Sequence, residues 1–272
     1  MDALTVMEPR LVAEDTHMLS AHIPVPGLGL LPANAYLVCG EQPVLVDTGI
    51  LSLGERFFDQ IAELVDPADL RWIWLTHLDP DHMGCLAQLI DEAPGARIVT
   101  TFLGMGKLNL IRPVPPERFY LMNPGQTFDA GDRGLLAVQP PTFDAPESLA
   151  VFDRKTRALF SSDAFGGLVA EPHESAAAIA PAELREGIIR WTAVDVPWLA
   201  RIAGDDLEAS LGQIVGLAPE VVLSSHLPPA EDMVQSLADA VAAARLTQPF
   251  VGPDQSALQQ MLAGGGSGAA SP

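Results

Sequence analysis

Residues 76–84 read Thr76-His77-Leu78-Asp79-Pro80-Asp81-His82-Met83-Gly84. This stretch follows an apolar run at residues 70–75 that is typical of a buried strand, and it precedes a helical pattern at residues 83–90. Four side chains that can bind a metal ion lie within six residues. A turn between a strand and a helix can direct alternate side chains into one cavity, and a helix N-terminus stabilises negative charge there. We therefore predict a metal site at this junction.

The apolar pattern on both sides of this stretch alternates between strand-like and helical segments. The strand-like runs are at residues 11–19, 35–39, 43–47, 70–75, 97–101, 135–138, 149–152, 158–161 and 221–224. The helical spacings are at residues 52–65, 83–90, 181–192, 198–217 and 231–244. This alternation predicts a layered α/β fold. No linker divides the chain, so we expect a single domain over residues 1–263, followed by a Gly/Ser/Ala-rich tail, residues 264–272, that is disordered.

Composition and charge restrict the class of protein. A hydrophobic fraction of 48% indicates a globular chain with a sizeable core. The net charge of −20 repels phosphate backbones, so we expect no nucleic-acid partner. No stretch of 18 apolar residues predicts a membrane span, and no basic segment before an apolar block predicts a secretory signal, so we expect a cytoplasmic protein. Two cysteines do not make a disulfide framework.

Metal-binding residue types also follow other apolar runs. Asp47 lies in Leu45-Val46-Asp47-Thr48-Gly49, Asp163 lies in Leu159-Phe160-Ser161-Ser162-Asp163-Ala164-Phe165-Gly166, and His226 follows residues 221–225. With residues 76–84, these motifs resemble those of the metallo-β-lactamase superfamily, whose signature is His-x-His-x-Asp-His. Asp79 stands where the hydrolases of that superfamily carry their second His. The motifs span residues 34–230, and the resemblance implies a four-layer αββα sandwich.

Within that superfamily, the pattern is most similar to the diiron branch of flavodiiron and oxygen-binding diiron proteins. That branch has a carboxylate, usually Glu, at the position of Asp79, and its His-x-Pro-x-Ser motif is similar to Asp144-Ala145-Pro146-Glu147-Ser148. Here Asp144 replaces a His. The resemblance implies one ion held by His77, Asp79 and Asp144. It implies a second ion held by Asp81, His82 and His226, with Asp163 bridging the two. Asp47 is expected to orient the 76–84 turn through hydrogen bonds and not to bind metal.

The formal charge of this ligand set favours redox chemistry. Four aspartates contribute −4, so two divalent ions are fully neutralised, whereas the hydrolase pattern retains a +2 excess that activates water and attracts anionic substrates. Carboxylate oxygens suit iron or manganese better than zinc and stabilise the higher oxidation state. We therefore expect two iron ions, with manganese or zinc as alternatives, in an enzyme or sensor that reacts with O2 or NO. Asp81 and Asp163 are the predicted catalytic residues.

Two other functions remain open from the sequence. One is a metal-dependent hydrolase of esters, thioesters, lactones or phosphoesters, in which Asp81 orients a metal-bridging hydroxide. The other is a non-catalytic sensor or binding module. The printed sequence shows no Gly-rich phosphate loop for a flavin and no flavodoxin-like domain after His226, so we expect an external electron donor. The resemblance also implies a homodimer. For a small-molecule or diatomic substrate, the Pro-rich loops at residues 23–32 and 110–116 are candidate pocket walls.

Overall fold

Two β-sheets form the centre of the structure, a computed structural model that describes residues 4–264. The eight-stranded sheet has the order β1 (Thr5–Val6), β3 (Thr16–Val25), β4 (Gly29–Val38), β5 (Val44–Val46), β6 (Trp72–Trp74), β7 (Arg97–Thr100) and β8 (Phe119–Leu121), with β2 (Arg10–Ala13) paired to β3. The six-stranded sheet has the order β14 (Ala230–Glu231), β13 (Val221–Leu223), β12 (Ala158–Phe160), β11 (Ala150–Asp153), β10 (Gly134–Val138) and β9 (Thr127–Asp129).

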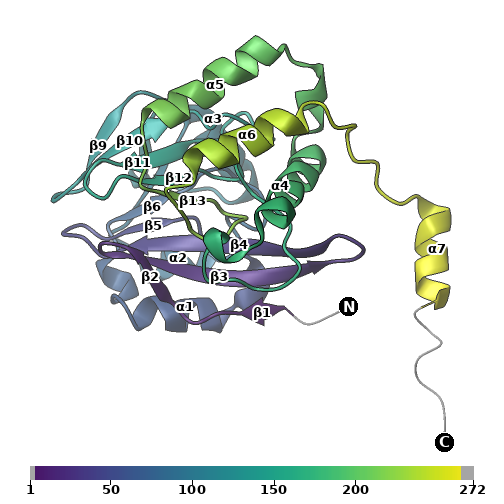
Figure 1. The fold of residues 1–272 in the computed structure, drawn as a ribbon. Helices are drawn as coiled ribbons and strands as arrows, with labels where there is room; N and C mark the ends of the chain where they lie inside the picture. The colour runs from purple at the N-terminus through teal and green to yellow at the C-terminus, as the bar shows by residue number, and fades with distance from the viewer. Residues whose placement is uncertain (1–3, 265–272) are drawn as a thin grey trace, which may run out of the picture.

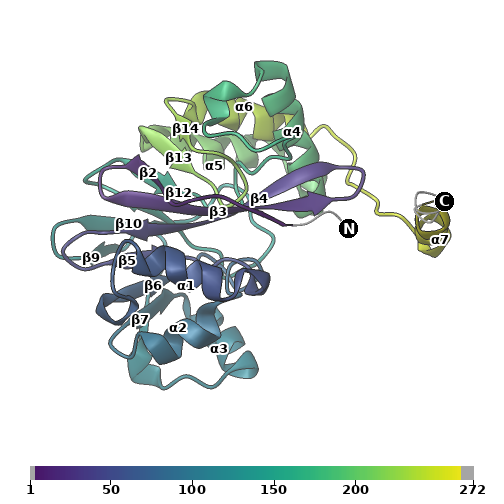
Figure 2. The same cartoon turned by 90° about the horizontal axis from the view of Figure 1, so that it is seen from below.

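Helices cover the outer face of each sheet (Figure 1, Figure 2). The first sheet carries α1 (Glu55–Ala62), α2 (Leu86–Glu92) and α3 (Phe102–Ile111), and the second carries α4 (Pro181–Asp195), α5 (Gly204–Gly216) and α6 (Val234–Ala244). Five short 3₁₀ segments connect these elements, at Leu51–Leu53, Pro67–Asp69, Pro116–Arg118, Ala176–Ala178 and Pro197–Arg201. Helix α7 (Gln255–Gly264) lies apart from the sheets in both views. Among the helices at residues 4–264, none is both long enough and apolar enough to cross a membrane.

Three apolar cores show that the fold has four layers. One core joins α1 and α2 to the first sheet, and includes Phe57, Ile61 and Leu89. A second joins the helices α4, α5 and α6 to the second sheet. The third lies between the sheets, where Tyr36 and Trp74 of one meet Phe160 and Phe128 of the other. The αββα sandwich that the sequence predicts is therefore confirmed.

The strand directions explain where polar side chains gather. Strand β5 runs parallel to β6, with Val46 opposite Trp74, and β12 runs parallel to β13, with Phe160 opposite Leu223. Parallel neighbours end at the same edge of a sheet, so the residues that follow them meet there. Asp47 and Thr76 follow the first pair, and Asp163 and His226 follow the second.

The structure corrects several boundaries. Residues 11–19, predicted as one strand, form a hairpin, because Asp15 adopts a φ of 60° and turns the chain between β2 and β3. Residues 198–217, predicted as one helix, divide into a 3₁₀ segment and α5. Most of residues 23–32, predicted as a loop, lie in the strands of the β3–β4 hairpin, and α3, β8 and β9 were not predicted. Most of the tail predicted at residues 264–272 lies outside the described residues.

Candidate metal centre

All seven predicted metal ligands converge at one edge of the two sheets. The loop after β6 supplies His77, Asp79, Asp81 and His82, and the second sheet supplies the others: Asp144, Asp163 and His226. Donor atoms of His77, Asp79 and Asp144 lie within 4.8 Å of one another, and so do those of Asp81, His82 and His226. These two triads are the ones that the resemblance implies.

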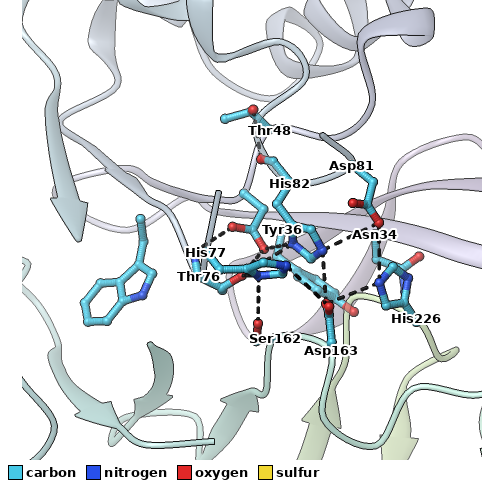
Figure 3. A network of polar contacts seen from close by, with 12 residues as sticks. Asn34, Tyr36, Thr48, Thr76, His77, Asp81, His82, Ser162, Asp163 and His226 are labelled. Atoms are coloured by element: carbon cyan, nitrogen blue, oxygen red, sulfur yellow. Dashed lines mark hydrogen bonds and ion pairs between the residues drawn. The ribbon is translucent and has the colours of Figure 1, made fainter. Parts of the chain in front are cut away.

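The Asp163 carboxylate points toward the rings of His77, His82 and His226 (Figure 3). Its Oδ2 is 3.3 Å from Nε2 of His77, and its Oδ1 is 3.0 Å from Nε2 of His82 and 3.2 Å from Nε2 of His226. Asp81 Oδ2 contacts the same two histidines, at 3.6 Å from His82 and 3.5 Å from His226. Asp163 therefore occupies the position of a bridge between two ions, and ligation by these seven side chains remains a prediction.

Each histidine is oriented by a hydrogen bond at its other ring nitrogen. Nδ1 of His82 lies 2.9 Å from Asp47 Oδ2, Nδ1 of His226 lies 2.6 Å from the carbonyl oxygen of Pro32, and Nδ1 of His77 lies 3.2 Å from Ser162 Oγ. The Nε2 atoms of His77 and His82 are buried without a hydrogen-bond partner. When Nδ1 carries the proton, Nε2 presents a lone pair, which is the form that binds metal.

Asp47 also holds the 76–84 turn. Its Oδ1 accepts from the backbone N–H of Thr76 at 2.8 Å, and its Oδ2 accepts from Thr76 Oγ1 at 2.7 Å. Thr48 donates its backbone N–H and its hydroxyl to the carbonyl oxygen of His82, at 2.7 and 3.0 Å. The expected orienting role of Asp47 is confirmed. Helix α2 begins only at Leu86, so these contacts, and not the helix N-terminus that the sequence favoured, stabilise the turn.

Close backbone packing and backbone strain also gather at the site. A Cβ at Gly84 would lie 2.2 Å from the backbone nitrogen of Leu51, so only glycine fits there. Asp47, Ser162 and Phe165 adopt φ values of 59°, 57° and 66°. Such conformations cost on the order of 1–2 kcal/mol for non-glycine residues and persist where the surroundings enforce them. The hydroxyl of Ser162 contacts Nδ1 of His77 at 3.2 Å.

Opposite charges keep the buried groups of the site in balance. Burial alone would raise the pKa of Asp163, but the imidazoles of His82, His77 and His226 hold it well below its usual value. Burial would lower the pKa of His226, but Asp163 and Asp81 raise it to about 9. Burial, followed by the neighbouring carboxylates, raises the pKa of Asp79 and of Asp144. Neighbouring carboxylates whose pKa values are raised in this way favour the binding of a cation between them.

The site opens to solvent on its carboxylate side. The side chains of Asp81 and Asp144 are 26% and 27% exposed, whereas those of His77, His82 and His226 are 0–2% exposed. Of the two predicted pocket walls, residues 23–27 and 29–30 of the β3–β4 hairpin line a pocket of about 790 Å³ with Ile50 and Ala170, but none of the seven predicted ligands lines it. The other wall, residues 110–116, does not contribute to that pocket.

Four residues near the site were not predicted from the sequence. Asn34 and Tyr36 of β4 donate hydrogen bonds to the carbonyl oxygen of Ser224, at 3.0 and 2.7 Å, and so hold the loop that carries His226. Trp191 of α4 packs against the His226 ring with centroids 4.8 Å apart, and Asp195 lies one turn further along the same helix. An acidic residue between Val194 and Val196 was the one signal for Asp195.

A family model described as "ODP family beta lactamase" matches residues 31–188, more than half of the chain. The chain belongs to the ODP beta-lactamase family. Among curated proteins, this ODP-family chain is 31% identical over 134 residues to the putative diflavin flavoprotein A 1 of Thermosynechococcus vestitus, with 49% of this chain and 23% of that protein covered. It is 28% identical over 194 residues to the anaerobic nitric oxide reductase flavorubredoxin of Klebsiella pneumoniae, with 71% of this chain and 40% of that protein covered. The chain thus spans less than half the length of these curated relatives.

Solved structures of flavodiiron cores share the fold of the ODP-family chain. The rubredoxin oxygen:oxidoreductase of Desulfovibrio gigas superimposes with a TM-score of 0.77 at 21% identity, covering 87% of this chain and 61% of that chain. A fragment of the putative diflavin flavoprotein A 5 of Nostoc sp. PCC 7120 superimposes with a TM-score of 0.74 at 19% identity, covering 90% of this chain and 98% of that chain. The shared fold, together with the family model and the flavorubredoxin relatives, confirms the predicted resemblance to the flavodiiron proteins of the metallo-β-lactamase superfamily.

Proposed function

We propose that this chain is a non-haem diiron oxidoreductase that binds O2 or NO and reduces it with electrons from a flavin-carrying donor. The observation that carries the proposal is the composition of the centre, in which four aspartates and three histidines converge. Relatives named nitric oxide reductase and oxygen:oxidoreductase support the choice of a diatomic substrate.

The residues present fit a pair of iron ions. His77 Nε2, His82 Nε2 and Asp163 Oδ1 are buried without hydrogen-bond partners, and all three face the same space. Buried polar atoms of this kind need a partner, and a cation shared by imidazole nitrogens and carboxylate oxygens supplies one. His77, Asp79 and Asp144 would hold one ion, Asp81, His82 and His226 the other, and Asp163 would contact both. When bound, the iron pair would supply electrons and open positions for a diatomic molecule.

The aspartates of this chain determine which chemistry the site favours. Four negative charges offset two divalent ions, so the site lacks the positive excess with which a hydrolase attracts an anionic substrate and activates water. The same charges stabilise ferric iron relative to ferrous iron. Asp47, Ser162 and the carbonyl oxygen of Pro32 hold the three imidazoles with Nε2 inward, where they would bind the ions.

The overall reaction requires a supply of electrons and protons. Reduction of two NO molecules to N2O and water consumes two electrons and two protons, and reduction of O2 to two water molecules consumes four of each. We assign the electrons to a reduced flavin on another protein or domain, because the relatives named diflavin flavoprotein and flavorubredoxin carry flavin in their names. The exposed edges of Asp81 and Asp144 mark the side from which protons and gas would reach the site.

Metal content and gas consumption test the proposal together. Protein produced in iron-supplemented medium, without chelators, is expected to contain about two irons per chain and an absorption band that bleaches on reduction and returns with air. With a chemically reduced flavin as donor, an electrode is expected to record consumption of NO or O2. Two zinc ions, no uptake of iron and turnover of ester or thioester substrates would instead establish a hydrolase.

A further inference from the structure

Helix α4 packs closely against the metal centre. A Cβ at Gly187 would lie 2.2 Å from the carbonyl oxygen of Leu168, and a Cβ at Gly166 would lie 2.6 Å from the Trp191 ring. The two glycines therefore let the helix approach the loop that follows Asp163. Residues four apart lie on the same face of a helix, so Trp191 and Asp195 both face this loop. Trp191 contacts the ring of His226, and Asp195 is the last residue of the helix.

The Asp195 carboxylate joins the ligand cluster. Its oxygen lies within 4.8 Å of carboxylate oxygens of both Asp144 and Asp163. Two oxygens that share an ion, each about 2.1 Å from it, lie at most about 4.2 Å apart, so a small side-chain rotation brings Asp195 within reach of the same ion.

The carboxylates of Asp144, Asp163 and Asp195 repel one another unless a cation lies between them. Asp195 ends α4, where the helix dipole is negative, and like charges within 5 Å repel. Oδ1 of Asp163 is buried without a hydrogen-bond partner beside His82 and His226, whereas its Oδ2 lies 3.3 Å from Nε2 of His77. An ion held between Asp144, Asp163 and Asp195 would remove the mutual repulsion of the three carboxylates.

The proposed ligand triad is weakest at Asp144, because its side chain is shorter than the His that the resembled pattern has at this position. We propose that Asp195 is an additional carboxylate ligand of the ion held by His77, Asp79 and Asp144, and that it compensates for the short reach of Asp144. This inference rests on the proposed diiron function. It makes the first ion position richer in carboxylate than the second.

The test measures metal binding by the complete chain. Asp195→Asn retains the shape of the side chain but is a poorer metal ligand, and Glu186→Gln makes the same change on the exposed side of α4 as a matched control. Wild-type protein and both variants are titrated anaerobically with Fe(II), and separately with Co(II), against a competing chelator. Asp195→Asn is expected to lower the affinity for one of the two ions by about 10- to 100-fold and to leave the affinity for the other unchanged. Its Co(II) absorption bands are expected to shift as well, and Glu186→Gln is expected to match the wild type.

Two further measurements separate ligation from a structural role. Metal-free Asp195→Asn is expected to unfold at or above the temperature of the metal-free wild type, because the substitution removes a repelled carboxylate. Asp195→Glu, which restores the carboxylate, is expected to recover at least half of the lost affinity on a logarithmic scale. If Asp195→Asn binds both ions within twofold of the wild type and gives the same Co(II) spectrum, Asp195 is not a ligand, although the diiron proposal stands. If the wild type binds no pair of ions, both proposals fail.

Discussion

The hydrogen bond between Asp47 and His82 offers a sharp test of how this chain prepares its metal centre. Asp47 accepts three hydrogen bonds, from Thr76 N–H, from the Thr76 hydroxyl and from Nδ1 of His82. Asp47→Asn preserves the shape of the side chain, and its one oxygen can still accept from Thr76 N–H. Its amide nitrogen then faces His82 Nδ1 and can only donate. To accept this bond, His82 must move its proton to Nε2, the atom that lies 3.0 Å from Asp163 Oδ1.

The expected loss follows from this tautomer change. A hydrogen bond to a charged partner contributes about 1.5–3 kcal/mol, and every 1.4 kcal/mol corresponds to a tenfold change in binding. The substitution is therefore expected to lower the affinity for the ion at His82 by about 10- to 100-fold, the range found for groups that orient metal-binding histidines. The second ion position is expected to change much less, because His77 has its own partner in Ser162.

The assay combines chelator competition with nitrogen NMR of the histidine rings. Asp129→Asn is the matched control, because Asp129 accepts a hydrogen bond from Gly131 in an exposed turn away from the site. In the metal-free wild type, Asp163 and Asp47 raise the pKa of His82 well above its usual value in spite of burial, and Asp47→Asn is expected to lower it. Wild-type metal affinity together with an unchanged His82 ring spectrum in Asp47→Asn would refute the orienting role of Asp47.

Three other predictions concern protons and packing. The pKa of His226 in the folded metal-free protein is raised to about 9 from 6.5, so His226 contributes stability below pH 6.5 that is lost as pH rises to about 9. Over the same pH interval the metal affinity is expected to rise, because His226 must lose its proton to bind an ion. Calorimetry in buffers of different ionisation enthalpy measures this proton release, and equal affinities at pH 6.5 and 9 would contradict the prediction. Gly84→Ala is expected to lower the free energy of unfolding by about 3 kcal/mol or more, because its Cβ meets backbone at 2.2 Å; Gly106→Ala, with open space around the new Cβ, is the control in urea denaturation. Arg133→Met is expected to cost about 3–5 kcal/mol by the same measurement, because it leaves the buried Asp153 carboxylate without its partner at 3.1 Å, and Asp153→Asn in the same chain is expected to recover part of the loss.

The sequence predicts the elements whose pattern is local. Short apolar runs such as β5 and β12 are buried over their whole length, and the residues after them can be assigned to the sheet edge once the strands are taken as parallel neighbours. Helix α3 was missed because it is apolar around most of its circumference, and exposed Phe102 and Leu110 leave no amphipathic pattern to detect. The β2–β3 hairpin was missed because its turn depends on Asp15 in a left-handed conformation, which composition does not reveal.

Some residues of the site can likewise be predicted from a short stretch of sequence, whereas others depend on the tertiary structure. The cluster at residues 77–82 is visible because its members are neighbours in sequence, and the other predicted ligands were found by resemblance of motifs. Asp195 and Trp191 reach the site only because Gly166 and Gly187 allow α4 to pack tightly, which no short segment encodes. The pairing of Ser162 with His77, which lie 85 positions apart, depends on the packing of the two sheets and likewise could not be predicted.

The predicted ligands come from both sheets, and this division affects how the molecule holds together. Four of them follow β6 in the first sheet, and three belong to the second sheet, up to 149 positions further along the chain from His77 to His226. A shared pair of ions would therefore be a cross-link between the two halves of the sandwich, across an interface otherwise held by apolar side chains such as Tyr36 and Phe160. Neither half carries a full donor set alone, so the centre can assemble only after the halves have docked. Separation of the sheets would then require release of the metal first, which would tie the lifetime of the folded chain to the dissociation rate of its ions.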